Sequence, residues 1–158
     1  MANTFTQMYI QIIFCPKGRE NLIHSDFEER LYQYITGIVK ERELKLIAIN
    51  GMPDHLHIFI GFNPTIKIAD LVGDIKTGAS KFLKSKRLVP GTFSWQRGYG
   101  CFSYAHSQID SVAKYVMNQK EHHRKKSFRA EYLQLLQKFE IEYEEKYLFE
   151  FYDEFITR

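Results

Sequence analysis

The sequence predicts a single α+β domain of the ferredoxin-like type, with an antiparallel sheet, helices on one face and further helices at the C-terminus. Three observations support this fold class. Short segments rich in β-branched and aromatic residues alternate with longer segments of helical periodicity. Their order is strand, helix, strand, strand, helix, strand, and two more helices follow. No linker or repeat divides the 158 residues, so one domain is expected over 1–158.

The N-terminal half of the chain predicts a strand, a helix and a hairpin. Ser25-Asp26 is typical of a helix N-cap, and apolar residues then recur at helical spacing. Turn residues separate the two strands of the hairpin, so these strands should pair antiparallel. The predicted ranges are 8–14 for the first strand, 26–43 for the helix, 44–49 for the second strand and a start at His55 for the third.

The C-terminal half predicts a helix, an aromatic strand and two further helices. Proline and glycine residues separate these elements, as expected for breaks in regular structure. The predicted ranges are a helix from Pro64 to before Pro90, a strand over 92–104 with a turn at Arg97-Gly98, a helix over 107–122 and a last helix from Ser127. The core of the domain is expected over about 8–123, and an acidic, aromatic tail over about 140–158.

The tail contains apolar residues at helical spacing, which should pack on the body of the protein or on a partner subunit. These residues are Leu148, Phe149, Tyr152, Phe155 and Ile156. The aromatic residues of the predicted strand, Trp95, Tyr99 and Phe102, are expected in the core, although each could stack on a base.

Charge is distributed unevenly along the chain. The net charge is +3, yet 75–109 contains no acidic residue, and a second basic cluster at 114–129 has only Glu121 as an acid. Clustered lysine and arginine suit a polyanion such as nucleic acid, although ordinary solvated helix faces would look similar. The candidate phosphate contacts, chosen from charge alone, are Lys76, Lys81, Lys84, Arg97, Arg124, Lys125 and Lys126.

Composition argues against membrane and secreted classes. No stretch is long and apolar enough to span a membrane, and the N-terminus lacks the pattern of a secretory signal. Cys15 and Cys101 are the only cysteines and form no C-x-x-C pair. We therefore expect two reduced thiols in a cytoplasmic protein, which would be associated with the nucleoid when bound to DNA.

Two histidines on the predicted third strand are candidate metal ligands. Because strand side chains alternate between faces, His55 and His57 share one face. Two imidazoles on a rigid strand can begin a divalent metal site that keeps coordination positions open for a substrate. A surface pair or a hydrogen-bonded structural pair is the plainer interpretation of these residues alone. Asp54 is expected to be a turn residue, although it could also orient a histidine.

A second candidate group lies on the helix predicted over 107–122. Tyr115 and Gln119 lie one turn apart, on the shoulder of the buried stripe, near the sheet but not fully buried. A tyrosine at this position could reach a ligand on the sheet, and Gln119 could add an oxygen, although packing is the simpler role. The remaining nearby histidines, His106, His122 and His123, are not expected to be ligands.

These two groups together fit one reaction. A metal held by two histidines can polarise a phosphodiester oxygen. Tyrosine, whose ordinary pKa is about 10, needs such an activated electrophile. Its attack would give a phosphotyrosine-linked strand and a free hydroxyl. Because that linkage keeps the energy of the phosphodiester, the hydroxyl could reverse the step and join a new strand without ATP.

The order of three motifs resembles the single-tyrosine HUH transposases, the small TnpA-type transposases of bacterial and archaeal insertion sequences. The motifs are His55-Leu56-His57 on a strand, the run from Trp95 to Gly100, and Tyr115 followed four residues later by Gln119. The resemblance covers nearly the whole chain, from residue 8 to about residue 128.

This resemblance implies roles for individual residues. Tyr115 would be the nucleophile, forming a 5′-phosphotyrosine with single-stranded DNA and leaving a 3′-OH. His55, His57 and Gln119 would bind Mg²⁺ or Mn²⁺. The family also implies a homodimer, in which the helix with the tyrosine can complete the partner's active site, and recognition of subterminal DNA hairpins at the element ends.

Three other interpretations fit part of the sequence. A non-catalytic module that binds single-stranded nucleic acid would explain the basic middle but not the joint presence of His55, His57, Tyr115 and Gln119. A replication or relaxase-type HUH nicking enzyme is usually larger or has several domains. The third interpretation is a metal-binding protein of unrelated function.

Overall fold

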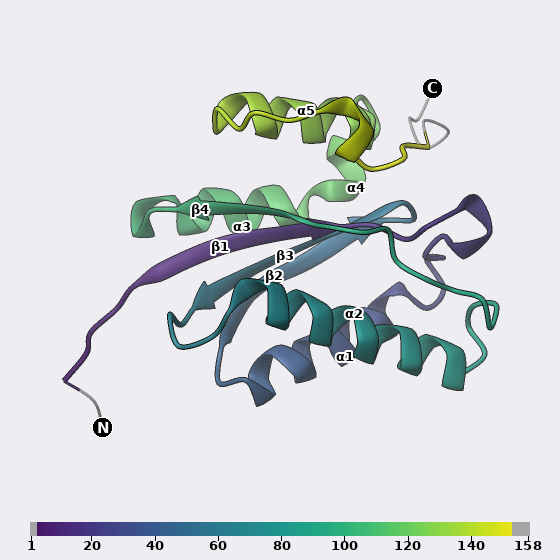
Figure 1. The fold of residues 1–158 in the computed structure, drawn as a ribbon, viewed down its shortest axis with the longest axis horizontal. Helices are drawn as coiled ribbons and strands as arrows, with labels where there is room; N and C mark the ends of the chain where they lie inside the picture. Colours follow the sequence, from purple (N-terminus) through teal and green to yellow (C-terminus); the bar gives the residue numbers. More distant parts are fainter. Residues whose placement is uncertain (1–2, 153–158) are drawn as a thin grey trace.

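The protein forms one four-stranded sheet, seen in a computed structural model that describes residues 3–152. The strand order is β2-β3-β1-β4, and all neighbouring strands are antiparallel (Figure 1). The strands are β1 (Met8–Phe14), β2 (Lys45–Met52), β3 (His55–Phe62) and β4 (Gly100–Tyr104). Together with the helices between them, they confirm the predicted α+β fold class.

Helices α1 (Glu28–Glu41) and α2 (Ile68–Ser85) cover one face of the sheet (Figure 1). Apolar residues from both helices and from alternate positions of β3 form the main core there. They include Leu31, Ile35, Leu71, Ile75, Leu56, Ile58 and Ile60, each completely or almost completely buried. Burial of this apolar surface is the main stabilising contribution to the sandwich.

The opposite face of the sheet is covered by α3 (Ile109–Met117), α4 (Gln119–His122) and α5 (Phe128–Lys138) (Figure 1). A small second core joins α3 to the sheet, and its buried members are Ala48, Phe59, Val112 and Val116. Strand alternation places His55 and His57 on the same face as Phe59, so both histidines point toward these three C-terminal helices.

The hairpin of β2 and β3 is confirmed, and β1 has the predicted bounds, but several helix and strand ends differ. The helix predicted over 107–122 is broken at Asn118, whose φ of −97° and ψ of 19° are not helical. The predicted N-cap at Ser25-Asp26 is wrong, because α1 begins at Glu28 after Phe27 without a side-chain cap.

Two further elements are shorter than the sequence predicted. α2 begins at Ile68, since the residues after Pro64 form a turn, and β4 covers only 100–104 of the predicted strand. Before β4 the chain instead makes an isolated bridge between Trp95 and Pro16.

The C-terminal tail packs on the body, but the helix expected within it is not formed over 148–152. Phe149 and Tyr152 are buried, and the backbone N–H of Gly18 donates to the Tyr152 hydroxyl at 2.7 Å. Gln96 binds the tail from the loop before β4, since its Oε1 accepts from the backbone N–H of Glu150 at 2.7 Å. Phe155 and Ile156 lie outside the described residues.

Two observations relate to the composition of the chain. No helix within 3–152 is long and apolar enough to cross a membrane. Cys15 and Cys101 both carry free thiols, as expected.

Candidate active site

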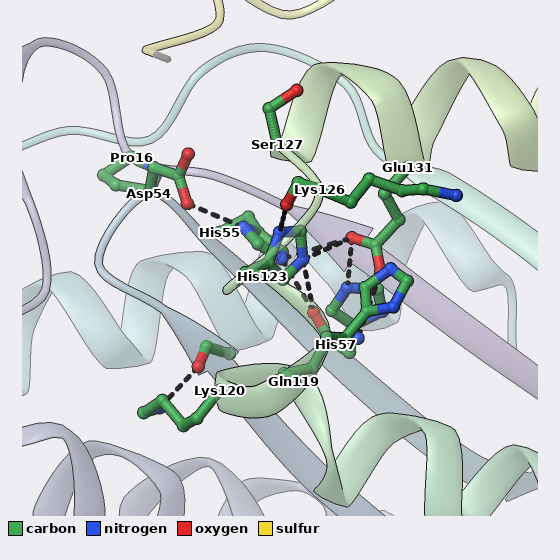
Figure 2. A network of polar contacts seen from close by, with 12 residues as sticks. Pro16, Asp54, His55, His57, Gln119, Lys120, His123, Lys126, Ser127 and Glu131 are labelled. Carbon is green, nitrogen blue, oxygen red and sulfur yellow. Dashed lines mark hydrogen bonds and ion pairs between the residues drawn. The ribbon is translucent and has the colours of Figure 1, made fainter. Parts of the chain in front are cut away.

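Three buried histidines converge between the sheet and α5 (Figure 2). His55 and His57 come from β3, and His123 follows directly after α4. The rings of His55 and His57 are 5.0 Å apart between centroids, and those of His55 and His123 are 4.6 Å apart. His123 was not expected among the candidate ligands, and its place in this cluster corrects that expectation.

Each of these rings is oriented by an acceptor on its Nδ1 side. The Nδ1 atoms lie 2.7 Å from Asp54 Oδ1 for His55, 2.6 Å from Gln11 Oε1 for His57 and 2.6 Å from the backbone oxygen of Lys126 for His123. An acceptor at Nδ1 fixes the proton there and leaves Nε2 for a metal, which is the usual arrangement of metal-binding histidines. Asp54 therefore orients His55 and is more than the expected turn residue.

Glu131 of α5 completes the cluster and was missed in the sequence. Its Oε1 lies 3.0 Å from His123 Nε2, 3.1 Å from His57 Nε2 and 3.3 Å from His55 Nε2. One donor atom from each of the four residues lies within 4.8 Å of the others. Imidazole nitrogens and a carboxylate oxygen at this spacing fit a divalent cation, so the cluster is a candidate metal site.

The electrostatics of the cluster also favour a cation. Burial alone would raise the pKa of Glu131, but the surrounding imidazoles hold that pKa well below its usual range, so the carboxylate is ionised. Burial alone would lower the pKa of His55, but the carboxylates of Asp54 and Glu131 outweigh it and raise the pKa to about 10. Without a metal, His55 therefore carries a proton on both ring nitrogens at neutral pH, and a bound divalent ion would displace the proton from Nε2. The two buried acids would stabilise the positive charge of that ion.

Gln119 points into the same centre. Its Oε1 lies 3.0 Å from His55 Nε2 and 2.9 Å from His123 Nε2, and its Nε2 donates to Glu131 Oε2 at 3.0 Å. The side chain is fully buried, which differs from the predicted partial exposure. The break at Asn118 starts a new helix at Gln119, whose side chain contacts Glu131 of α5.

Tyr115 lies at the edge of the cluster. Its hydroxyl donates to Glu131 Oε2, and its ring centroid is 5.7 Å from that of His57. Burial and the charge of Glu131 raise the pKa of Tyr115, so the hydroxyl keeps its proton at neutral pH. Within the chain, Tyr115 therefore lies beside the histidines of its own β3.

A cavity of about 470 Å³ opens beside Tyr115, between α3 and α5. Tyr115 and Glu131 of the cluster line it, together with further polar side chains that include Ser111, His122, Gln134 and Lys138. The cavity gives a ligand a route to the tyrosine hydroxyl.

The predicted phosphate contacts are divided between two sides of the sheet. Lys81 and Lys84 are exposed on α2, on the face opposite the cluster, while Arg124 and Lys125 are exposed just after His123. Arg97 is exposed in the loop before β4.

Lys76 has a structural role that the charge pattern did not reveal. Its Nζ donates to the backbone oxygens of Gln96 and Gly98 at 2.9 and 2.7 Å. Three aromatic residues were predicted to lie in the core, and this is confirmed. Phe102 is buried, and Trp95 and Tyr99 are partly buried and pack against the core.

Residues 4–119 match the family model described as "Transposase IS200 like". The chain belongs to the IS200-like transposase family. It is 22% identical over 118 residues to the ISDra2 transposase TnpA of Deinococcus radiodurans, covering 72% of this chain and 84% of that protein. The IS200-like match ends at Gln119, so His123 and Glu131 lie beyond it.

Two solved structures resemble this IS200-like transposase in fold. A Deinococcus radiodurans R1 protein assigned as a transposase has a TM-score of 0.59 at 20% identity, over 75% of this chain and 95% of that one. A REP-associated tyrosine transposase bound to a REP hairpin has a TM-score of 0.55 at 11% identity, over 75% and 70% of the two chains. At these identities, both similarities show a shared fold.

Proposed function

We propose that this IS200-like transposase cleaves and rejoins single-stranded DNA through a 5′-phosphotyrosine at Tyr115. The cation, Mg²⁺ or Mn²⁺, would be held by His55, His57 and Gln119 together with the cluster around them. The observation that carries the proposal is the convergence of Tyr115 with buried, oriented histidines in a chain of this family. A cation bound there would polarise a phosphate oxygen and stabilise the charge that develops on it.

The covalent step follows from the placement of Tyr115. Its Oη attacks phosphorus, the Oη–P bond forms and the bond from phosphorus to the 3′-oxygen breaks. Glu131 accepts the hydrogen bond of the Tyr115 hydroxyl and so orients Oη, and the tyrosine proton is transferred through water to the leaving 3′-oxygen, which becomes the 3′-OH. In the joining step a 3′-OH attacks the phosphotyrosine and releases Tyr115.

The substrate would be single-stranded DNA with hairpins at the ends of the element. Support comes from the related fold that binds a REP hairpin, and from the polar cavity beside Tyr115. Exposed Arg124 and Lys125 lie close in sequence to the cluster and are the favoured phosphate contacts. We further propose a homodimer that acts in the cytoplasm, at the nucleoid when bound to DNA.

The experiment that tests the proposal is a covalent adduct assay. The full chain is incubated with labelled single-stranded hairpin DNA and Mn²⁺, and adducts are separated under denaturing conditions. We expect an adduct with the wild-type protein and with Tyr147→Phe, whose tyrosine is 78% exposed and remote in sequence. The Tyr115→Phe protein should form none, and a chelator should also prevent it. An adduct with Tyr115→Phe would overturn the assignment of the nucleophile.

A further inference from the structure

The two carboxylate oxygens of Glu131 face different partners. Oε1 lies within 3.3 Å of the Nε2 atoms of the three histidines (Figure 2). Oε2 accepts from the Tyr115 hydroxyl and from Gln119 Nε2. One side chain therefore touches both the candidate cation site and the nucleophile. It belongs to α5, which follows the segment that matches the family.

We propose that Glu131 joins the cation site to the nucleophile, as a metal ligand through Oε1 and as the residue that positions the Tyr115 hydroxyl through Oε2. The proposal rests on the function proposed above and deepens it. Its consequence is that α5 makes the active site self-contained, so Tyr115 serves the histidines of its own chain.

The local structure holds Glu131 firmly in this place. Ser127 caps α5, since its Oγ accepts from the backbone N–H of Ala130 at 3.1 Å. The ring of Phe128 stacks on that of His55, with 4.0 Å between centroids and 3° between planes. One turn later, Tyr132 packs between Phe128 and Phe149 of the tail. The first turn of α5 therefore packs against His55, and Phe149 of the tail packs against the next turn at Tyr132.

The burial of Glu131 also needs an explanation beyond packing. Only 2% of this residue is exposed, and an ionised carboxylate is seldom buried without a charged partner or a metal. The acceptors at Nδ1 leave the three Nε2 atoms facing Oε1, and the four donor atoms lie within 4.8 Å of one another, a spacing that fits a shared cation. A carboxylate ligand adds a hard, negatively charged oxygen to the imidazole nitrogens and the amide oxygen of Gln119, which strengthens binding of Mn²⁺.

The first test measures Mn²⁺ binding by electron paramagnetic resonance on the full chain without DNA. We expect Glu131→Gln to weaken Mn²⁺ binding by about tenfold or more, as loss of a ligand should cost at least as much as loss of a residue that orients one. The matched control is Glu145→Gln, an exposed acid on the tail, which should bind as wild type does. Circular dichroism establishes that each variant is folded.

The outcomes of this test separate the two proposals. Equal affinity of wild type and Glu131→Gln would overturn the role of Glu131 and leave the proposed function intact. Unchanged Mn²⁺ binding by His57→Ala would instead contradict the metal site on which the proposed function rests.

The second test asks which chain supplies the tyrosine. Tyr115→Phe and His57→Ala proteins are co-expressed with different tags, purified together and assayed for the covalent adduct. We expect no adduct, because neither chain has both the nucleophile and the complete cluster. An adduct at a substantial fraction of the wild-type level would show that Tyr115 of one chain serves the histidines of another, and would overturn the self-contained site.

Discussion

Glu131 Oε1 lies 3.1 Å from His57 Nε2, although 74 residues separate the two in the sequence. His57 belongs to the middle of the sheet, and Glu131 belongs to the last helix, which covers that face. The contact shows that folding brings the sheet and the last helix together at the cluster. A preformed set of this kind should bind a cation with little rearrangement, and binding should then stabilise the folded protein.

The first prediction concerns thermal stability in the presence of metal. Mn²⁺ at a hundred times its dissociation constant should add about 2.7 kcal/mol to the free energy of unfolding. For a domain of this size, that corresponds to a rise in Tm of about 5–10 °C. Differential scanning calorimetry with Mn²⁺ and with a chelator would measure it. His57→Ala should show no rise, and a rise as large as that of the wild type would contradict the site.

The second prediction concerns Gln11, which touches His57 and not the cation. Gln11 Oε1 accepts from His57 Nδ1 at 2.6 Å, and its Nε2 donates to the Tyr104 hydroxyl at 2.8 Å. Gln11→Met keeps the volume but removes both bonds, so Mn²⁺ affinity should fall by about tenfold to a hundredfold. Isothermal titration calorimetry would measure the change. Gln33→Met, on the exposed side of α1, is the control, and equal affinities would exclude an orienting role for Gln11.

Much of the fold and half of the site were predictable from local patterns. Strand alternation placed His55 and His57 on one face, and their burial in β3 follows from the apolar residues around them. Helical spacing brought Tyr115 and Gln119 to the same side. These residues carry short-range signals because each pair lies only a few residues apart, even though the break at Asn118 puts Tyr115 in α3 and Gln119 in α4.

The rest of the site depends on contacts between distant elements. Gln11 and His123 reach the cluster only through sheet pairing and through the turn that follows α4, which no local pattern describes. Glu131 did leave one signal. It occupies a position in the apolar stripe of α5, between Phe128 and Leu135, and an acid on a buried stripe requires a partner.

The third prediction compares two glycines. A Cβ at Gly51, in the hairpin before His55, would lie 2.2 Å from the backbone oxygen of His55, so the strands would have to shift. Gly51→Ala should lower the free energy of unfolding by about 1–3 kcal/mol. A Cβ at Gly37, inside α1, would meet nothing within 4 Å, so Gly37→Ala should raise it by about 0.5–1 kcal/mol. Urea denaturation would measure both, and a Gly51→Ala protein as stable as wild type would disprove the close approach.

The fourth prediction concerns thiol reactivity. Burial raises the pKa of Cys101 to about 11, and it raises that of Cys15 as well. At pH 8 the folded thiols should therefore react with a disulfide reagent about two orders of magnitude more slowly than a free cysteine. The rate should increase about tenfold per pH unit from 8 to 10, since the thiolate is the reactive form. Both thiols should react at the rate of a free cysteine once denaturant unfolds the protein. A fast reaction in the folded protein would contradict the burial of the two thiols.

The most direct test of the account is to locate the covalent bond. The wild-type protein is reacted with hairpin DNA and Mn²⁺, the DNA is trimmed with a nuclease, and the peptides are sequenced by mass spectrometry. The account predicts a nucleotide phosphate on Tyr115 and on no other tyrosine. A nucleotide on a different residue, or quantitative cleavage of the DNA with no modified peptide, would contradict it.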